Sequence, residues 1–220
     1  MSRTPDPDSE LGGSAPCSLH ELGPDGSPRD RLQALEVARW RRNERARLLT
    51  LRMGLPAPER ARHTAAIEAA LDGLIAPAPG HIVSVYWPIR AEPDLRAWMH
   101  AAVARGLRIA LPVAVELAQP LTFREWWPGA RMARGLWNIP HPAEGAEVLP
   151  TVVLAPLVGF DPACYRLGYG GGFFDRTLAA LVHRPQVIGL GYPQLRIPTI
   201  YPQWHDIPMN RILTGEEPAT

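Results

Sequence analysis

The sequence contains little cysteine, little net charge and no long apolar run, and each shortage excludes a class of protein. Its two cysteines, Cys17 and Cys164, form no disulfide or metal-binding pattern, which favours a reducing compartment. No apolar run approaches the ~18 residues that a membrane span requires. A net charge of +1 gives no general case for a nucleic-acid or acidic partner. We therefore expect a cytoplasmic protein that binds neither membranes nor nucleic acid.

Proline is abundant by contrast, with 25 residues in a chain of 220. Residues 1–28 are rich in Pro, Gly, Ser and Asp, a composition that buries little apolar area and is not that of a signal peptide. We predict a disordered or loosely docked tail over residues 1–28, followed by one domain over residues 29–220. That domain is long enough for a substantial apolar core.

Helical and buried-strand patterns alternate along the rest of the chain. Helices are predicted over residues 30–53, 58–74 and 95–105, and in a last segment that ends near residue 182. Strands are predicted over residues 81–86, 107–113, 151–156, 186–192 and 212–213, with an edge strand over residues 121–126. The spacing of strand, helix and strand fits a right-handed parallel unit. The predicted fold class is α/β: a single three-layer domain with a mainly parallel sheet and helices on both faces.

A glycine-rich loop between the strand at 151–156 and the last helix is the most informative stretch. Glycines at 168, 170, 171 and 172 leave backbone N–H groups open, and the following helix N-terminus carries partial positive charge, so the loop suits an anion. Arg166 adds a cation whose geometry fits phosphate, and Asp175 is placed to hold Mg²⁺ beside it. A plain glycine turn is the alternative. The loop is not a Walker A motif and fits the dinucleotide fingerprint poorly.

Arginines crowd the predicted helix at residues 30–53. Most of them are expected on a solvated helix face. Arg41 and Arg45 are four residues apart and share a face that can point at one polyphosphate, with Arg42 competing for the place of Arg41. Nucleic-acid binding through this helix is a third interpretation. It is disfavoured because no second basic patch with interleaved aromatic residues is present.

Two motifs resemble those of an enzyme family. The loop region reads RLGYGGGFFDRTLA, preceded by PLVGFD, and WNIPHP lies upstream at residues 137–142. Together they resemble the 5-formyltetrahydrofolate cyclo-ligase family, also called 5,10-methenyltetrahydrofolate synthetases, over about residues 39–214. The resemblance implies a ligase that uses ATP and Mg²⁺ to convert 5-formyltetrahydrofolate to 5,10-methenyltetrahydrofolate, with release of ADP and phosphate. We expect a monomer whose partners are these small molecules.

The resemblance also implies roles for individual residues. It implies that ATP is bound by Arg41, Arg42, Arg45, Arg166, Leu167, Gly168, Tyr169, Gly170, Gly171, Gly172, Phe173 and Phe174. It implies that the folate is bound by Glu92, Trp137, Tyr169, Gly170, Gly171, Gly172 and Phe173. Asp175 and Asp206 would hold Mg²⁺, and Arg166 and Asp175 would be the catalytic residues. A flat apolar ring at Trp137 suits stacking on a flat pterin.

Two positions depart from the family pattern. Gly171 stands where family loops often carry lysine, and Phe173–Phe174 stands where the family commonly has at least one tyrosine. We expect Phe174 to line the cleft where ATP and folate meet. These departures keep an alternative function open, that of a folate- or nucleotide-binding paralogue with weak or no turnover.

Overall fold

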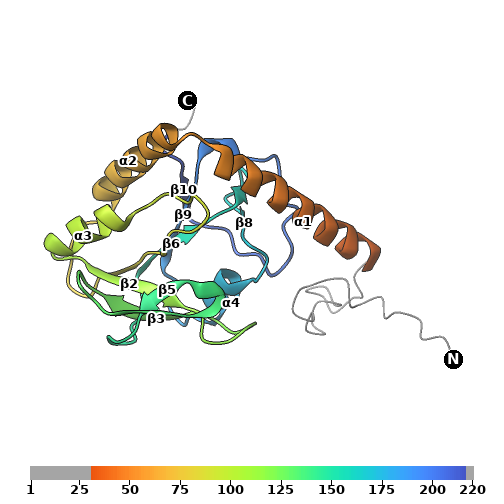
Figure 1. The fold of residues 1–220 in the computed structure, drawn as a ribbon. Helices are drawn as coiled ribbons and strands as arrows, with labels where there is room; N and C mark the ends of the chain where they lie inside the picture. The colour runs from red at the N-terminus through yellow and green to blue at the C-terminus, as the bar shows by residue number, and fades with distance from the viewer. Residues whose placement is uncertain (1–30, 217–220) are drawn as a thin grey trace.

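The computed structural model describes residues 31–216 (Figure 1). The tail predicted over residues 1–28 lies outside the described residues. Among those that are described, no helix is both long and apolar enough for a bilayer crossing. The helical elements are α1 (Arg31–Gly54), α2 (Ala57–Leu74), α3 (Arg96–Ala104) and α4 (Phe173–Ala180), with short 3₁₀ segments η2 (Leu136–Asn138) and η3 (Pro193–Leu195).

Six strands form the central sheet, in the order β10-β9-β6-β1-β2-β3. Their bounds are β1 (Ile82–Ser84), β2 (Arg108–Val113), β3 (Thr122–Trp126), β6 (Val152–Pro156), β9 (Gln186–Leu190) and β10 (Arg211–Leu213). Neighbouring strands are parallel except for β2 and β3, which pair antiparallel. The sheet is therefore mainly parallel, with β3 at one edge as predicted.

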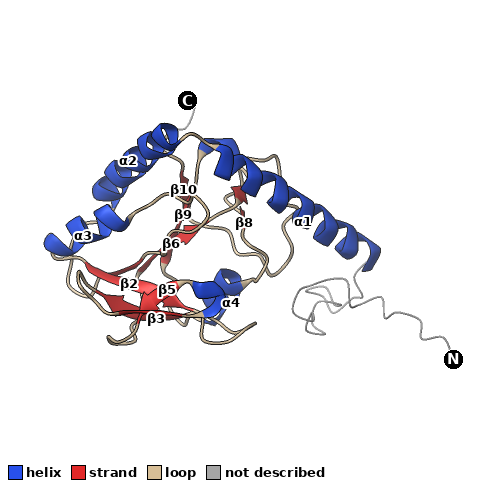
Figure 2. Ribbon diagram, viewed as in Figure 1, coloured by secondary structure: helices blue, strands red, loops and turns tan. Residues whose placement is uncertain are grey.

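Side chains alternate between the two faces of the sheet because successive strand residues point in opposite directions. On one face, Val83 and Leu154 share a core cluster with Leu71 of α2 and Met99 of α3. The opposite face packs against α1 and α4 in a second cluster, which includes Leu48, Ala155, Leu178 and Val187. Figure 2 shows the sheet lying between α2 and α3 on one side and α1 and α4 on the other. The predicted three-layer α/β fold is confirmed.

The strand order reverses between β1 and β6. From β1 the chain moves outward to β2, and it later returns to place β6 on the other side of β1. In open α/β sheets, the carboxyl ends of two such strands form the crevice in which ligands bind. The segment after β1 leads to Glu92, and the segment after β6 leads to the glycine loop. The topology therefore brings these two distant stretches to one place.

Two small hairpins lie outside the central sheet and were not predicted. β4 (Met132–Arg134) pairs with β5 (Pro140–Pro142), and β7 (Gly159–Phe160) pairs with β8 (Arg166–Leu167), both antiparallel. Strands of two or three residues are too short to show a periodic pattern in the sequence. The second hairpin matters for the site because it places Arg166 directly before the glycine loop.

Candidate active site

The glycine loop leads from β8 into the first turn of α4. Gly170 (φ 98°) and Gly172 (φ 63°) take left-handed backbone conformations, which residues with a Cβ rarely adopt. Gly172 is the N-cap residue of α4, so the loop backbone lies at the positive end of that helix. α4 ends at Ala180, earlier than the predicted end near residue 182, because Leu181 is already extended. The loop thus has the local geometry of an anion site.

Arg166 and Asp175 form an ion pair across the loop, with Nη2 of the arginine donating to Oδ2 of the aspartate at 2.8 Å. The two side chains are 5% and 17% exposed. The guanidinium also lies 5.0 Å from the centre of the Phe174 ring. Its Nε is buried without a hydrogen-bond partner. Arg166 therefore keeps donor capacity beyond its pairing with Asp175.

Two arginines of α1 reach this region. Arg45 donates from Nε to the carbonyl of Gly168 at 2.9 Å. Arg41 is buried and pairs with Asp206, at 2.5 Å between Nη2 and Oδ2. Arg42 is exposed. The structure therefore brings Arg41 and Arg45 into contact with Asp206 and Gly168, while Arg42 is exposed to solvent.

The two aspartates expected to hold Mg²⁺ lie close in the fold, because the backbone N–H of Ile207 donates to Asp175 Oδ1 at 3.3 Å. Each carboxylate is paired with an arginine, Asp175 with Arg166 and Asp206 with Arg41. Within the described part of the chain, no group of three His, Cys, Asp or Glu side chains is arranged to hold a metal by itself. Mg²⁺ commonly binds through one or two carboxylates together with substrate phosphates, so this donor set suits a metal that arrives with a nucleotide.

Glu92 lies in the segment after β1 and is 5% exposed. Two consecutive residues before it, Arg90 (φ 47°) and Ala91 (φ 59°), take left-handed conformations that are costly without glycine. The Glu92 carboxylate accepts hydrogen bonds from the N–H of Ile89 at 2.8 Å and from the hydroxyl of Tyr169 at 2.6 Å. Burial raises the pKa of the Glu92 carboxyl, and the Tyr169 hydrogen bond opposes that rise. Glu92 and the glycine loop therefore meet at the crevice.

Arg52 is a residue of this site that the sequence analysis did not single out. It was expected on a solvated helix face, but its side chain is fully buried. Its guanidinium donates to the Tyr169 hydroxyl and lies 3.9 Å from Glu92 Oε1. The sequence could have indicated the burial of Arg52, because Leu48 is four residues before it and lies on the same buried face of α1.

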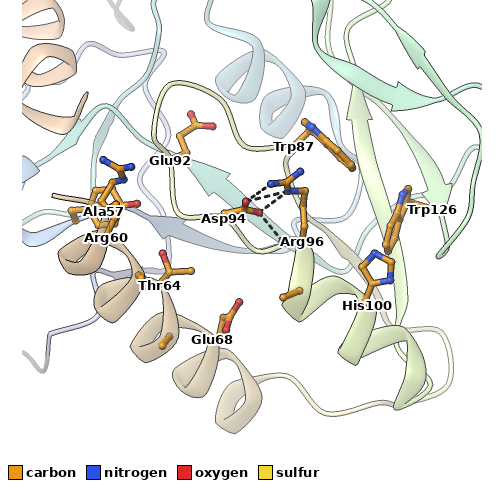
Figure 3. Close-up of a pocket in the computed structure, with 14 residues that line it drawn as sticks. Ala57, Arg60, Thr64, Glu68, Trp87, Glu92, Asp94, Arg96, His100 and Trp126 are labelled. Atoms are coloured by element: carbon orange, nitrogen blue, oxygen red, sulfur yellow. Dashed lines mark hydrogen bonds and ion pairs between the residues drawn. The ribbon is translucent and has the colours of Figure 1, made fainter. Parts of the chain in front are cut away.

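A cavity of about 670 Å³ opens beside Glu92 (Figure 3). It lies between α2, α3 and the segment after β1, and its wall includes the indole rings of Trp87 and Trp126. Arg96 also lines it and pairs with Asp94 at 2.6 Å. Aromatic walls with a few polar groups at one end suit a flat ligand with polar edges. The sequence did not reveal this cavity because its walls come from separate elements.

Trp137 lies against the glycine loop and does not line the cavity. Its ring is 60% exposed and meets Phe173 edge to face, with 5.2 Å between ring centres. Trp137 (φ 55°) and Asn138 (φ 62°) again take left-handed conformations. The two residues outside the glycine loop that were expected to bind folate thus contact different residues of the loop region, Trp137 at Phe173 and Glu92 at Tyr169.

Phe174, which was expected to line the cleft, contacts both the core and the guanidinium of Arg166. Its ring is partly buried and packs against core residues, among them a cluster that contains Phe123 and a cluster that contains Leu178. Neighbouring residues of a helix point in different directions, so Phe173 faces Trp137 while Phe174 faces the core. Phe174 therefore has a packing role under Arg166.

Arg176 is a second residue that the sequence analysis passed over. Its guanidinium donates to the carbonyl of Gly171 and lies 5.2 Å from the centre of the Phe173 ring. Arginine at this position of α4 brings a cation to the stretch of loop where Gly171 supplies none. The local charge of the loop is therefore more positive than its own residues indicate.

Comparisons with known proteins identify the family of the chain. The model of the 5-formyltetrahydrofolate cyclo-ligase family matches residues 37–215. The chain belongs to this family. A relative from Mycolicibacterium smegmatis, named 5-formyltetrahydrofolate cyclo-ligase, is 32% identical over 178 residues, covering 77% of this chain and 91% of the relative. A relative of the same name from Escherichia coli K12 is 30% identical over 141 residues, covering 61% of this chain and 78% of its own.

Solved structures show the cyclo-ligase fold as well. The structure of 5,10-methenyltetrahydrofolate synthetase from Aquifex aeolicus aligns with a TM-score of 0.69 at 25% identity, covering 80% of this chain and 90% of that protein. The synthetase from Mycoplasma pneumoniae aligns with a TM-score of 0.66 at 23% identity, covering 80% of this chain and 99% of its own. The family predicted from the glycine loop is confirmed, and with it the prediction of an enzyme.

Proposed function

We propose that this cyclo-ligase family member closes 5-formyltetrahydrofolate to 5,10-methenyltetrahydrofolate, using ATP and Mg²⁺ and releasing ADP and phosphate. The observation that carries the proposal is the position of the glycine loop between two kinds of groups. Two cations adjoin the loop, because Arg45 donates to the carbonyl of Gly168 and Arg166 pairs with Asp175, and both are available to a phosphate. On the other side, Tyr169 contacts Glu92 at the mouth of an aromatic-walled cavity. One loop can therefore hold a phosphate donor against a folate.

The chemistry requires activation of a formyl oxygen, which is a poor leaving group. The formyl oxygen attacks the γ-phosphorus of ATP, a new P–O bond forms, and the bond to ADP breaks. N10 of the same folate then attacks the formyl carbon, the C–O bond breaks with release of phosphate, and N10 loses its proton. The protein mainly positions the reactants and stabilises charge.

The phosphates would lie at the glycine loop, where the backbone N–H groups and the α4 N-terminus favour an anion. Arg166, Arg45 and Arg41 would balance their charge. Asp175 and Asp206 would hold the Mg²⁺ that accompanies ATP, which supplies charge neutralisation when bound. Both aspartates are now paired with arginines, and phosphate oxygens would compete for those same guanidinium groups.

The folate would occupy the cavity beside Glu92. A carboxylate accepts hydrogen bonds from adjacent N–H donors such as those on the edge of a pterin, and the Trp87 ring provides a flat apolar wall. Trp137, on the far side of the loop, would cover the formyl end of the folate or the nucleotide next to it. This proposed arrangement would have the pterin on one side of Tyr169 and the phosphates on the other.

A weakly active paralogue is the second candidate, favoured by the absence of tyrosine at Phe173 and Phe174. The structure reduces the weight of that departure, because Phe174 faces the core and Tyr169 places a phenol beside Glu92. A hydroxyl is thus present at the site, although not at the expected positions.

The proposed function is tested by following methenyltetrahydrofolate formation by absorbance, with purified protein, 5-formyltetrahydrofolate, ATP and Mg²⁺. We expect turnover that requires both ATP and Mg²⁺. Asp175→Asn should lose most of that turnover while it keeps folate binding, because one negative charge at the metal side is removed. Asp72→Asn is a matched control, since Asp72 is 45% exposed and pairs with Arg105 away from the loop.

Two outcomes would count against the proposal. A wild-type protein that binds folate and ATP but forms no product would point to the paralogue. Normal turnover of Asp175→Asn would show that Asp175 is not a ligand of the proposed metal, even if the wild-type enzyme is active.

A further inference from the structure

The further inference concerns Arg52, the buried arginine of α1. Its Nε donates to the carbonyl of Arg90 at 2.9 Å, and one terminal nitrogen donates to the carbonyl of Leu157 at 3.0 Å. Its other terminal nitrogen donates to the Tyr169 hydroxyl. Arg52 therefore joins the segment after β1, the segment after β6 and the glycine loop.

Burial of the Arg52 cation does not by itself stabilise the fold. A fully buried charge is costly unless it is paired and hydrogen-bonded, and an apolar residue would fill the same helix face at no such cost. Each donor of Arg52 is instead directed at a part of the crevice. One of these donors, Nε, binds the carbonyl of Arg90, and Arg90 belongs to the strained left-handed pair just before Glu92. The guanidinium thus stabilises the backbone turn that presents Glu92.

The groups that influence the charge of Glu92 approach it from three directions. Arg52 approaches from α1, Arg90 lies on the same segment as Glu92, and the Tyr169 hydroxyl comes from the glycine loop. The phenols of Tyr86 and Tyr192 also face this cluster, and Arg60 of α2 interacts with Tyr192 and lines the cavity beside Glu92. Burial acts to keep the Glu92 carboxyl neutral, and the two arginines act to keep it charged. Arg90 also lies over the Tyr169 ring, 5.7 Å from its centre, but of these two arginines Arg52 is the one whose guanidinium donates hydrogen bonds to both sides of the crevice.

We propose that Arg52 is a positioning residue, which orients the Glu92 carboxylate and the Tyr169 hydroxyl toward the pterin and so sets the affinity for folate. It acts through Glu92 and Tyr169 and touches no phosphate. This inference rests on the proposed function, because it takes the ligand beside Glu92 to be a folate. The contacts that make Arg52 a support of Glu92 are properties of the protein itself.

The test uses the full chain with three variants. Arg52→Met removes the charge and keeps much of the side-chain volume, and Arg52→Lys keeps the charge with fewer donors. Arg47→Met is the matched control, because Arg47 lies on the same helix but is exposed and pairs only with Glu44. The measurements are the KM for each substrate, the pH profile of folate kcat/KM, and the titration of Glu92 by ¹³C NMR, with its signal assigned through Glu92→Gln.

For Arg52→Met we expect the KM for 5-formyltetrahydrofolate to rise roughly tenfold or more, while the KM for ATP changes by less than about twofold. The NMR titration of Glu92 and the acid limb of folate kcat/KM should both move to higher pH. Arg52→Lys should restore part of each change, and Arg47→Met should behave as wild type. If Arg52→Met does not fold, Arg52→Lys and Tyr169→Phe provide the test, because each weakens the hydrogen bonds that connect Arg52 to Glu92 through Tyr169.

A purely structural role would give a different result. The two KM values would then rise together, and the Glu92 titration would stay in place in every soluble variant, which would overturn the proposal. A wild-type protein without cyclo-ligase activity would refute the proposed function alone. The NMR titration needs no substrate, so in that case it decides whether Arg52 supports Glu92.

Discussion

Tyr169 is the residue at which the two ends of the site meet. Its hydroxyl donates to Glu92 at 2.6 Å and accepts a hydrogen bond from Arg52, and its ring lies 5.6 Å from the guanidinium of that arginine. Burial raises the pKa of the Tyr169 phenol, and the nearby Glu92 charge adds to the rise. The phenol therefore stays protonated at neutral pH and remains a hydrogen-bond donor to Glu92.

At the residue scale, the first prediction concerns the pH dependence of folate use. Burial raises the pKa of Glu92, and the pterin N–H donors need its charged form. The carboxylate is present above the raised pKa and is lost as the pH falls through it. We expect folate kcat/KM to decline on the acid side at a higher pH than for an ordinary carboxyl, whose pKa is about 4.3.

The pH profile of Glu92→Gln provides the check. This variant should bind folate more weakly and should lack the acid limb, because it has no proton to gain in this range. Glu116→Gln, a change at an exposed position, should keep the wild-type profile. An acid limb that persists unchanged in Glu92→Gln would assign the limb to another group.

The second prediction concerns phosphate binding by Arg166. Arg166→Ala should raise the Kd for ATP roughly ten- to a hundredfold, because a charge-assisted hydrogen bond contributes about 1.5–3 kcal/mol. Folate binding should change much less, since Arg166 contacts Asp175 and not Glu92. Calorimetric titration with each ligand measures both values, with the exposed-site variant Arg184→Ala as the control. Equal weakening of both ligands would mean that Arg166 shapes the loop.

At the scale of elements, α1 contributes both to the proposed phosphate side and to the proposed folate side of the site. Arg41 and Arg45 in its middle reach Asp206 and the glycine loop, and Arg52 near its end reaches Glu92. The helix is held on the sheet by apolar residues between them, above all Leu48, which is fully buried in the second core cluster. The position of α1 therefore determines both halves of the site at once.

Leu48→Ala tests this coupling between packing and function. Truncation of a fully buried leucine typically costs about 2–5 kcal/mol of unfolding free energy, measured by urea denaturation. We expect a loss in that range, together with weaker binding of both ATP and folate. Met53→Ala on the same helix, where Met53 is 60% exposed, should change stability by less than about 0.5 kcal/mol. Unchanged stability of Leu48→Ala would show that α1 is held by other contacts.

At the scale of the whole molecule, the core clusters and the site residues described above belong to residues 31–216, the part of the chain that the structure describes. We predict that a chain starting at Arg29 keeps the thermal midpoint and the ATP affinity of the full chain. The reason is that the composition of residues 1–28 offers little apolar surface to the core. Thermal unfolding and ATP titration of the two chains compare them directly. Insoluble or unfolded protein from the shorter chain would assign a structural role to residues 1–28.

Much of the fold and the loop could be predicted from the sequence because the signals are local. Strands such as Val152–Pro156 are continuous apolar runs, and the glycines before Phe173 stand next to one another in the chain. The same holds for the family, whose motif is a single contiguous stretch around Arg166 and Asp175. These features depend on backbone chemistry that neighbouring residues determine among themselves.

The tertiary structure alone decided which distant side chains meet. Arg52, Glu92 and Tyr169 come together only because the strand order reverses between β1 and β6, and strand order is a non-local property of the whole sheet. The same reasoning explains why Arg41 and not Arg42 faces Asp206, since the orientation of α1 is set by its packing on the sheet. The sequence by itself determined the family and the glycine loop, and the packing of α1 and the sheet determined the proposed folate side of the site.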